Sequence, residues 1–157
     1  MWKTGNFFLS LYSLEEFFGK CVALSVNSLS NPTFIFPIRI YYEDTDAGGV
    51  VYHANYLRYM ERARTEWLRE TGYELTKLEQ EQGFIFAVRS ANVDFLKPAF
   101  LNDLLQVHVT VARKGKVSLD ILHEIYRENV LVCRAGIKLA GLAAGSFRPQ
   151  AIPFEID

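Results

Sequence analysis

Residues 42–53 have the sequence Tyr42-Glu43-Asp44-Thr45-Asp46-Ala47-Gly48-Gly49-Val50-Val51-Tyr52-His53. An apolar strand pattern precedes this stretch, and the longest helix pattern of the chain follows it. The stretch gathers carboxylates, two tyrosines, a pair of glycines and a histidine into one connection. Because loops held by a rigid scaffold carry much of the binding and catalytic chemistry of proteins, we expect the functional groups here.

The size and composition of the chain predict one globular domain. It has 157 residues, of which 50% are hydrophobic and 22% charged, so a sizeable core can be buried. The net charge is -1 and no block of like charge occurs, which argues against a nucleic-acid-binding surface.

The cysteines and the apolar segments indicate a cytoplasmic protein. Cys21 and Cys133 lie far apart without metal-type spacing, as expected for a reduced protein rather than a disulfide framework. No run reaches the roughly 20 apolar residues that a membrane span needs. The apolar N-terminal patches are broken by Glu15 and Glu16, and they lack a basic start and a cleavage site, which argues against a signal peptide.

Residues 1–33 differ in character from the rest of the chain. Apolar patches alternate there with acids, and the segment runs into a cluster of Asn, Ser and Pro that is typical of a linker. We interpret 1–33 as an N-terminal extension, either disordered, loosely packed or partly helical, or else not part of the natural product. The domain itself is expected to comprise residues 34–157.

A strand and a helix are predicted on either side of the 42–53 stretch. Residues 34–42 are rich in Phe, Ile and Tyr, and Pro37 indicates either an edge strand or a strand that starts after it. From 55 to 71 apolar residues recur at helical spacing, with Asn55 as N-cap and Gly72 just past the C-terminus.

The predicted helix is amphipathic. Arg62 and Glu66 lie four positions apart on its polar side and are expected to pair. Residues 74–82 are expected to add a short surface helix that Gly83 stops. The apolar stripe consists of Tyr56, Met60, Ala63 and Trp67, widened by Leu57 and Leu68.

After Gly83 the apolar period falls to two, which predicts strands. The segments with this pattern are 84–96, 105–111, 117–125 and 131–139, in which apolar residues either alternate with polar ones or form continuous runs. Gly115 is expected at a positive φ in a short hairpin. The chain therefore predicts an α+β domain in which a helix packs on one face of an antiparallel sheet of about five strands.

The sequence resembles the 4-hydroxybenzoyl-CoA thioesterase family, and within it the Tol–Pal-associated acyl-CoA thioesterase type. The likeness rests on residues 41–64, on 93–99 and on 148–153, and it spans roughly 34–154. It implies a hotdog fold, with a long central helix wrapped by the sheet, and an acyl-CoA thioesterase. Gly141, near the end of the last strand, departs from close relatives, which often carry larger residues there.

Asp46 is the principal catalytic candidate. Neither a Gly-x-Ser-x-Gly elbow nor a cysteine beside a histidine occurs, so an acid-based mechanism is favoured. The resemblance implies that Asp46 acts either as general base or as nucleophile through an acyl anhydride. The structural alternative is an Asx turn that closes before Gly48.

Other site residues follow from the same loop. Gly48 and Gly49 permit a close backbone approach to a ligand, and unpaired helix amides can polarise the thioester oxygen. The resemblance implies that His53 positions substrate or water, and Tyr42 can contact the acid or line the acyl pocket. Substrate binding is further assigned to Val50, Asn55 and Tyr56.

A basic hairpin is the candidate for the phosphates of coenzyme A. Arg113, Lys114 and Lys116 cluster there, although basic turns are also common as ordinary solvated surface. His108 and His123 lack acidic neighbours at ligand spacing, so no metal site is expected, and no cofactor beyond the CoA of the substrate.

An exposed sheet edge predicts a homodimer, which would bring the loop of one chain to the helix N-terminus of the other. The resemblance implies a homotetramer built as a dimer of dimers. Two alternative functions stay open at this stage: a hotdog enoyl-CoA hydratase or dehydratase that pairs Asp46 with His53, and an acyl-binding module without turnover.

Overall fold

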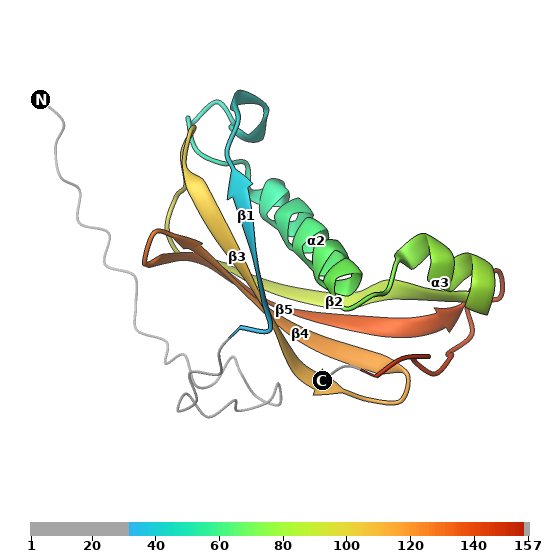
Figure 1. Cartoon of the computed structure of the whole chain (residues 1–157). Coiled ribbons are helices and arrows are strands. Elements are labelled where there is room, and N and C mark those ends of the chain that lie inside the picture. The colour runs from blue at the N-terminus through green and yellow to red at the C-terminus, as the bar shows by residue number, and fades with distance from the viewer. Residues whose placement is uncertain (1–31, 156–157) are drawn as a thin grey trace, which may run out of the picture. The chain divides into compact units, whose positions relative to one another are not determined.

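Five strands and a long helix dominate residues 32–155, the part of the chain that the computed structural model describes (Figure 1). The predicted extension 1–33 lies outside this part, apart from its last two residues. The elements are β1 (Phe34–Arg39), a 3-10 turn η1 (Tyr42–Asp44), α2 (His53–Glu70), α3 (Leu75–Gln82), β2 (Phe84–Phe95), β3 (Leu104–Lys114), β4 (Ser118–Arg127) and β5 (Val130–Ala143).

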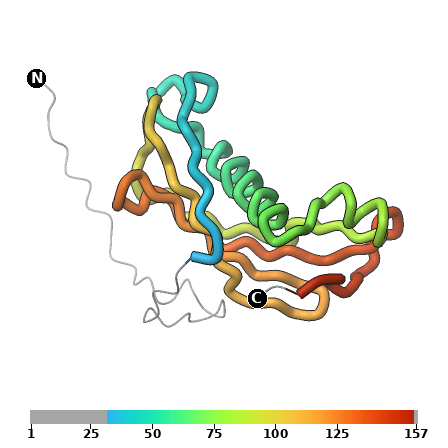
Figure 2. Tube along the Cα trace, viewed as in Figure 1, coloured from blue at the N-terminus to red at the C-terminus, as the bar shows by residue number. Residues whose placement is uncertain are grey.

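The strands form one antiparallel sheet in the order β1-β3-β4-β5-β2, and helix α2 lies across one face of it (Figure 2). All predicted strands are confirmed, and so is the edge position of β1 with Pro37. A curved sheet around a central helix is the hotdog arrangement that the resemblance implied. In the described residues, no helix is long and apolar enough to cross a bilayer.

Helix α2 begins two residues earlier than predicted. Tyr52 occupies the N-cap position without a side-chain cap, so the prediction of Asn55 as N-cap is wrong. The Asn55 side chain is buried and bonds elsewhere, which removes it from capping. The C-terminal prediction is confirmed, because Gly72 follows the helix at a φ of +91°. Gly83 likewise ends α3 in the left-handed conformation, at a φ of 59°.

The packing of α2 confirms most of the predicted stripe. Tyr56, Met60, Ala63, Trp67 and Leu68 are all buried against the sheet. Leu57 is instead 41% exposed, so that part of the prediction is wrong. Position 57 lies directly beside Tyr56 on the helix, about 100° around its axis, and the sheet covers only one side.

Two local predictions from the sequence also fail. Glu66 pairs with Arg69 rather than with Arg62, one turn later instead of one turn earlier. Gly115 does not adopt a positive φ, and its amide donates to the carbonyl of Ser118 across the β3–β4 hairpin. A side chain at Gly115 would meet the Ser118 hydroxyl at 2.7 Å, so space rather than φ favours glycine there.

Gly141 allows the C-terminal segment to cross strand β5. Its amide donates to Val117 and its carbonyl accepts from Gln150 at 2.9 Å. A methyl group at this position would lie 2.7 Å from the ring of Phe84 and 2.8 Å from the Gln150 carbonyl oxygen. The glycine is therefore required by close packing, which accounts for the departure noted in the sequence.

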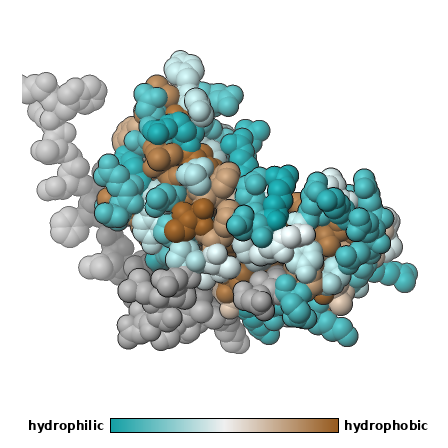
Figure 3. Space-filling model, viewed as in Figure 1, coloured by the Kyte–Doolittle hydropathy of each residue, from teal (hydrophilic) through white to brown (hydrophobic). Residues whose placement is uncertain are grey.

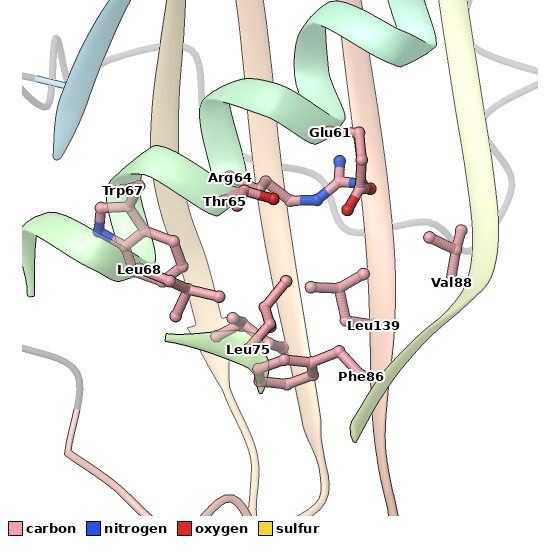
Figure 4. A pocket seen from close by; sticks show the side chains of 10 residues that line it. Glu61, Arg64, Thr65, Trp67, Leu68, Leu75, Phe86, Val88 and Leu139 are labelled. Atoms are coloured by element: carbon pink, nitrogen blue, oxygen red, sulfur yellow. The ribbon is translucent and has the colours of Figure 1, made fainter. Parts of the chain in front are cut away.

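The core also contains buried polar side chains, Arg64 on α2 and His123 on the sheet. Arg64 lies inside the fold and pairs with Glu61, beside a hollow of about 70 Å³ that Leu139 and Phe86 also line (Figure 4). His123, on β4, is also fully buried, and neither of its ring nitrogens has a hydrogen-bond partner within the described residues. Burial, reinforced by the charge of Arg64, lowers the pKa of His123 to about 3.

We predict that Gly141→Ala lowers the free energy of unfolding by about 1–3 kcal/mol, because it overpacks a site bounded by backbone. Urea unfolding measures the effect. Gly136→Ala in the same strand is the matched control, since nothing lies within 4 Å of a methyl group there. Equal stability of the two variants would contradict the packing argument.

We also predict that His123 makes stability pH-dependent. Its pKa is about 3 when folded and 6.5 in the unfolded chain, so unfolding takes up a proton between these values. Stability is therefore lost as pH falls below 6.5. From pH 7.5 to 5.0 the wild type should lose about 2 kcal/mol more than His123→Leu. Parallel pH profiles of the two proteins, from urea unfolding, would refute this.

Candidate active site

The candidate loop closes through a tight turn between Asp46 and Val50. The Asp46 amide donates to the Val50 carbonyl, and the Gly49 amide donates to the Asp46 carbonyl, both at 2.9 Å. Gly49 adopts a φ of +75°, which strongly favours glycine. An isolated bridge between Thr45 and Val51 closes the turn, and one between Val50 and Phe100 fastens it to the connection between β2 and β3.

The Asp46 carboxylate is exposed, and a hydrogen bond holds one of its two oxygens. Its Oδ1 accepts a hydrogen bond of 2.7 Å from the Gly48 amide, so the Asx turn considered as the structural alternative does form. A side chain at Gly48 would lie 3.0 Å from this oxygen, so a larger residue would require the carboxylate to shift. Within the described residues, Oδ2 has no hydrogen-bond partner. The turn therefore fixes one oxygen and leaves the other available.

A hollow of about 520 Å³ opens beside Asp46. Because Asp46 lines this hollow, a ligand that enters it can reach the residue within one protomer. The residues of the helix start do not line the hollow. Its lining consists of Tyr42, Thr45, Asp46, Ala47, Gly49 and Leu101.

Asp44, two residues before Asp46, is the anchor of the loop. Its carboxylate accepts from the Tyr41 amide at 2.9 Å, and its carbonyl accepts from the Tyr52 amide at 2.8 Å and the Asn55 side chain at 3.0 Å. Burial, together with the nearby Asp44 carboxylate, raises the pKa of Tyr59, so this hydroxyl stays neutral. Asp44 is thus structural, whereas Asp46 is exposed and lines the hollow.

The start of α2 presents free donors. It has no side-chain cap, and the amides of His53 and Ala54 have no partner among residues 32–155. The His53 ring is exposed and lies 4.5 Å from the Tyr52 ring and 6.2 Å from the Phe95 ring, between centroids. Unpaired amides at a helix N-terminus favour a partial negative charge on a ligand oxygen.

The remaining predicted site residues differ in accessibility. Tyr42 is 82% exposed at the hollow, and Val50 is half-buried. Tyr56 is 4% exposed and packs on Tyr59 and Phe95, and burial raises its pKa. Asn55 is turned inward onto Asp44. Only part of the predicted set therefore surrounds the hollow.

The basic hairpin lies at the other end of the sheet from the Asp46 loop (Figure 1). Strand β3 separates them, and its 11 residues span about 35 Å. Arg113 and Lys116 are exposed, but Lys114 binds the Glu155 carboxylate at 2.7 Å and the Phe154 carbonyl at 2.9 Å. Within one protomer this hairpin and Asp46 are not brought together.

Reasoning from the sequence missed Thr45 and Ala47 within the 42–53 stretch, which also line the hollow, and two residues outside that stretch. Leu101 lines the hollow from the connection between β2 and β3, and Phe95 contacts His53 from the end of β2. No spacing signal links either residue to Asp46. The sequence pattern between the strands that end at 96 and begin at 105 indicates only a connection there, and pairing of Val50 with Phe100 brings Leu101 to the loop.

Comparison with known proteins gives consistent matches. The profile of the thioesterase-like superfamily matches residues 41–157. The acyl-CoA thioesterase YbgC of Haemophilus influenzae is 41% identical over 123 residues, covering 78% of this chain and 90% of the relative. The acyl-CoA thioester hydrolase YbgC of Escherichia coli is 37% identical over 129 residues, covering 82% and 96%.

A similar fold occurs in a solved structure. The crystal structure of a probable thioesterase from Bartonella henselae superposes with a TM-score of 0.72 at 31% sequence identity. The superposition covers 76% of this chain and 98% of that one.

Proposed function

The chain belongs to the thioesterase-like superfamily, and from this premise we propose that it hydrolyses acyl-CoA thioesters to a free acid and CoA, with Asp46 as the catalytic carboxylate. Relatives named as acyl-CoA thioesterases share 37–41% identity over most of its length. The observation that carries the assignment to Asp46 is its exposed carboxylate, held at one oxygen by Gly48, at the wall of a hollow.

The proposed reaction is addition of oxygen to the thioester carbonyl carbon, followed by cleavage of the C–S bond. As general base, Asp46 takes a proton from a water molecule while the water oxygen attacks the carbonyl carbon. As nucleophile, the free Asp46 oxygen attacks directly, and water then hydrolyses the anhydride. In both cases the electron pair of the broken bond leaves on the CoA sulfur, which gains a proton. The geometry is compatible with either role.

The free amides at the start of α2 supply the second half of the proposed site. They suit the negative charge that develops on the carbonyl oxygen during attack. Since these residues do not line the Asp46 hollow of their own protomer, we propose that the partner subunit contributes the helix start. His53 then orients substrate or water next to Phe95.

The proposed dimer forms through the free edge of β2. This 12-residue strand has no neighbour on its outer side within the described sheet. Val88, Phe95 and Leu96 at this strand are each about half exposed. Apolar side chains reach the surface among polar ones in the space-filling view (Figure 3). An unpaired, apolar edge favours pairing with a second copy of the chain. From the family resemblance we further propose that two such dimers associate into a tetramer.

The proposed chemistry needs no redox or metal cofactor, because it breaks a C–S bond without electron transfer and CoA belongs to the substrate. Cys133 is a free thiol, and burial raises its pKa to about 12, which makes it inert. A reduced buried cysteine fits the proposed cytoplasmic location. The CoA phosphates would meet Arg113, Lys114 or Lys116 only if another subunit presents them.

We predict that Asp46→Asn lowers the turnover of acyl-CoA by 10²-fold or more, because the amide is neither base nor nucleophile. Thiol release from a panel of acyl-CoA substrates measures this. Glu43→Gln is the matched control, since Glu43 is an exposed acid in the same loop that does not line the hollow.

Undiminished turnover by folded Asp46→Asn would remove Asp46 from the reaction. Hydration of an enoyl-CoA without thiol release would favour the hydratase alternative, and binding without either activity would favour the acyl-binding module.

The dimer generates its own prediction. The protein should elute at two or four times the chain mass in light scattering, and Val88→Asp should shift it toward monomer and reduce turnover, because a charge is introduced into the β2 edge. Ile35→Asp, a comparable exposed position on the opposite edge strand, serves as control and should leave the mass unchanged. A monomeric wild type with full activity would contradict the shared site.

A further inference from the structure

We infer that Asn55 is a positioning residue, whose buried side chain holds the Asp46 loop in its catalytic geometry. The inference rests on the proposed function, because it assigns Asn55 an effect on Asp46. It differs from the substrate-binding role that was predicted for this residue from the sequence.

Asn55 is buried although it lies in the first turn of α2. Its residue is 6% exposed, and Asn55, Arg64 and His123 are the buried polar residues found between positions 32 and 155. Its amide nitrogen donates to the carbonyl oxygen of Asp44 at 3.0 Å, across 11 positions of sequence. The side chain is thus committed to the loop rather than to solvent or to the helix cap.

Backbone hydrogen bonds rather than side-chain packing hold the loop between this anchor and Asp46: Thr45 forms a bridge with Val51, and the Asp46 amide donates to the Val50 carbonyl at 2.9 Å. Residues 46–49 are all exposed, so packing does not fix them. Asp44 is held from three sides, by the amides of Tyr41 and Tyr52 and by Asn55. Only Thr45 separates it from Asp46, and its hydroxyl donates to the Tyr42 carbonyl at 2.8 Å. A displacement of the Asp44 carbonyl is therefore passed to the Asp46 carboxylate.

A direct contact of Asn55 with substrate is less compatible with this geometry. One N–H of its side chain already donates to the Asp44 carbonyl, and its oxygen accepts a long hydrogen bond of 3.5 Å from the Arg58 guanidinium. A substrate-binding residue would change KM. A positioning residue lowers kcat, because misplacement of a catalytic group by about 1 Å can reduce the rate by about 10²-fold.

The test is a double-mutant cycle of Asn55→Ala and Asp46→Asn, with kcat and KM measured for each protein. We expect Asn55→Ala alone to lower kcat by about 10- to 100-fold with KM changed less than about twofold. In the Asp46→Asn background the same change should have little further effect, because the group it positions is gone.

Two controls separate this effect from general destabilisation. Gly141→Ala lowers stability far from the loop and should leave kcat unchanged, and Gln80→Ala removes an exposed carboxamide from α3. Asn55→Ser, which keeps a polar group in the first helical turn but is too short to reach Asp44, replaces Asn55→Ala if the latter does not fold.

Additive effects in the cycle, or a rise in KM at constant kcat, would overturn the positioning role while leaving the proposed function intact. If Asp46→Asn itself retained full turnover, the proposed function would fail instead.

Discussion

The structure depends on the burial of one side of helix α2 against the curved sheet. Tyr59, Met60 and Trp67 are almost wholly excluded from solvent there, and side chains of this size contribute about 1.5–3 kcal/mol each when fully buried. This packing fixes where the helix starts. Since Asn55 and Tyr52 near that start both hold Asp44, the position of the Asp46 loop follows from the packing of the helix.

Two carboxylates in this loop have separate tasks. Asp44 is embedded in hydrogen bonds and orders the chain, whereas Asp46 keeps one oxygen free at a hollow. The Asx turn at Asp46 is compatible with a catalytic role, because it engages only one of the two carboxylate oxygens. One Asp46 oxygen accepts the hydrogen bond of the turn, which orients the carboxylate, and the other is left for a substrate or for water.

Much of the fold could be predicted from the sequence, because periodicity reports burial directly. The alternation in 105–111 and the stripe at Tyr56, Met60, Ala63 and Trp67 both appear as buried faces. Errors arose where the outcome depends on distant partners. Leu57 has the right residue type but no sheet beside it, and Asn55 resembles a cap but bonds to Asp44. Leu101 reaches the hollow only through strand pairing.

Catalysis by Asp46 requires contact between its carboxylate and the thioester. The most direct test is a crystal structure with a non-hydrolysable acyl-CoA analogue in which a methylene group replaces the thioester sulfur. We expect the analogue carbonyl carbon either about 3–3.5 Å from an Asp46 oxygen or bridged to it by one water. An analogue bound with its carbonyl in a different cavity, and with Asp46 facing bulk solvent, would contradict catalysis by Asp46.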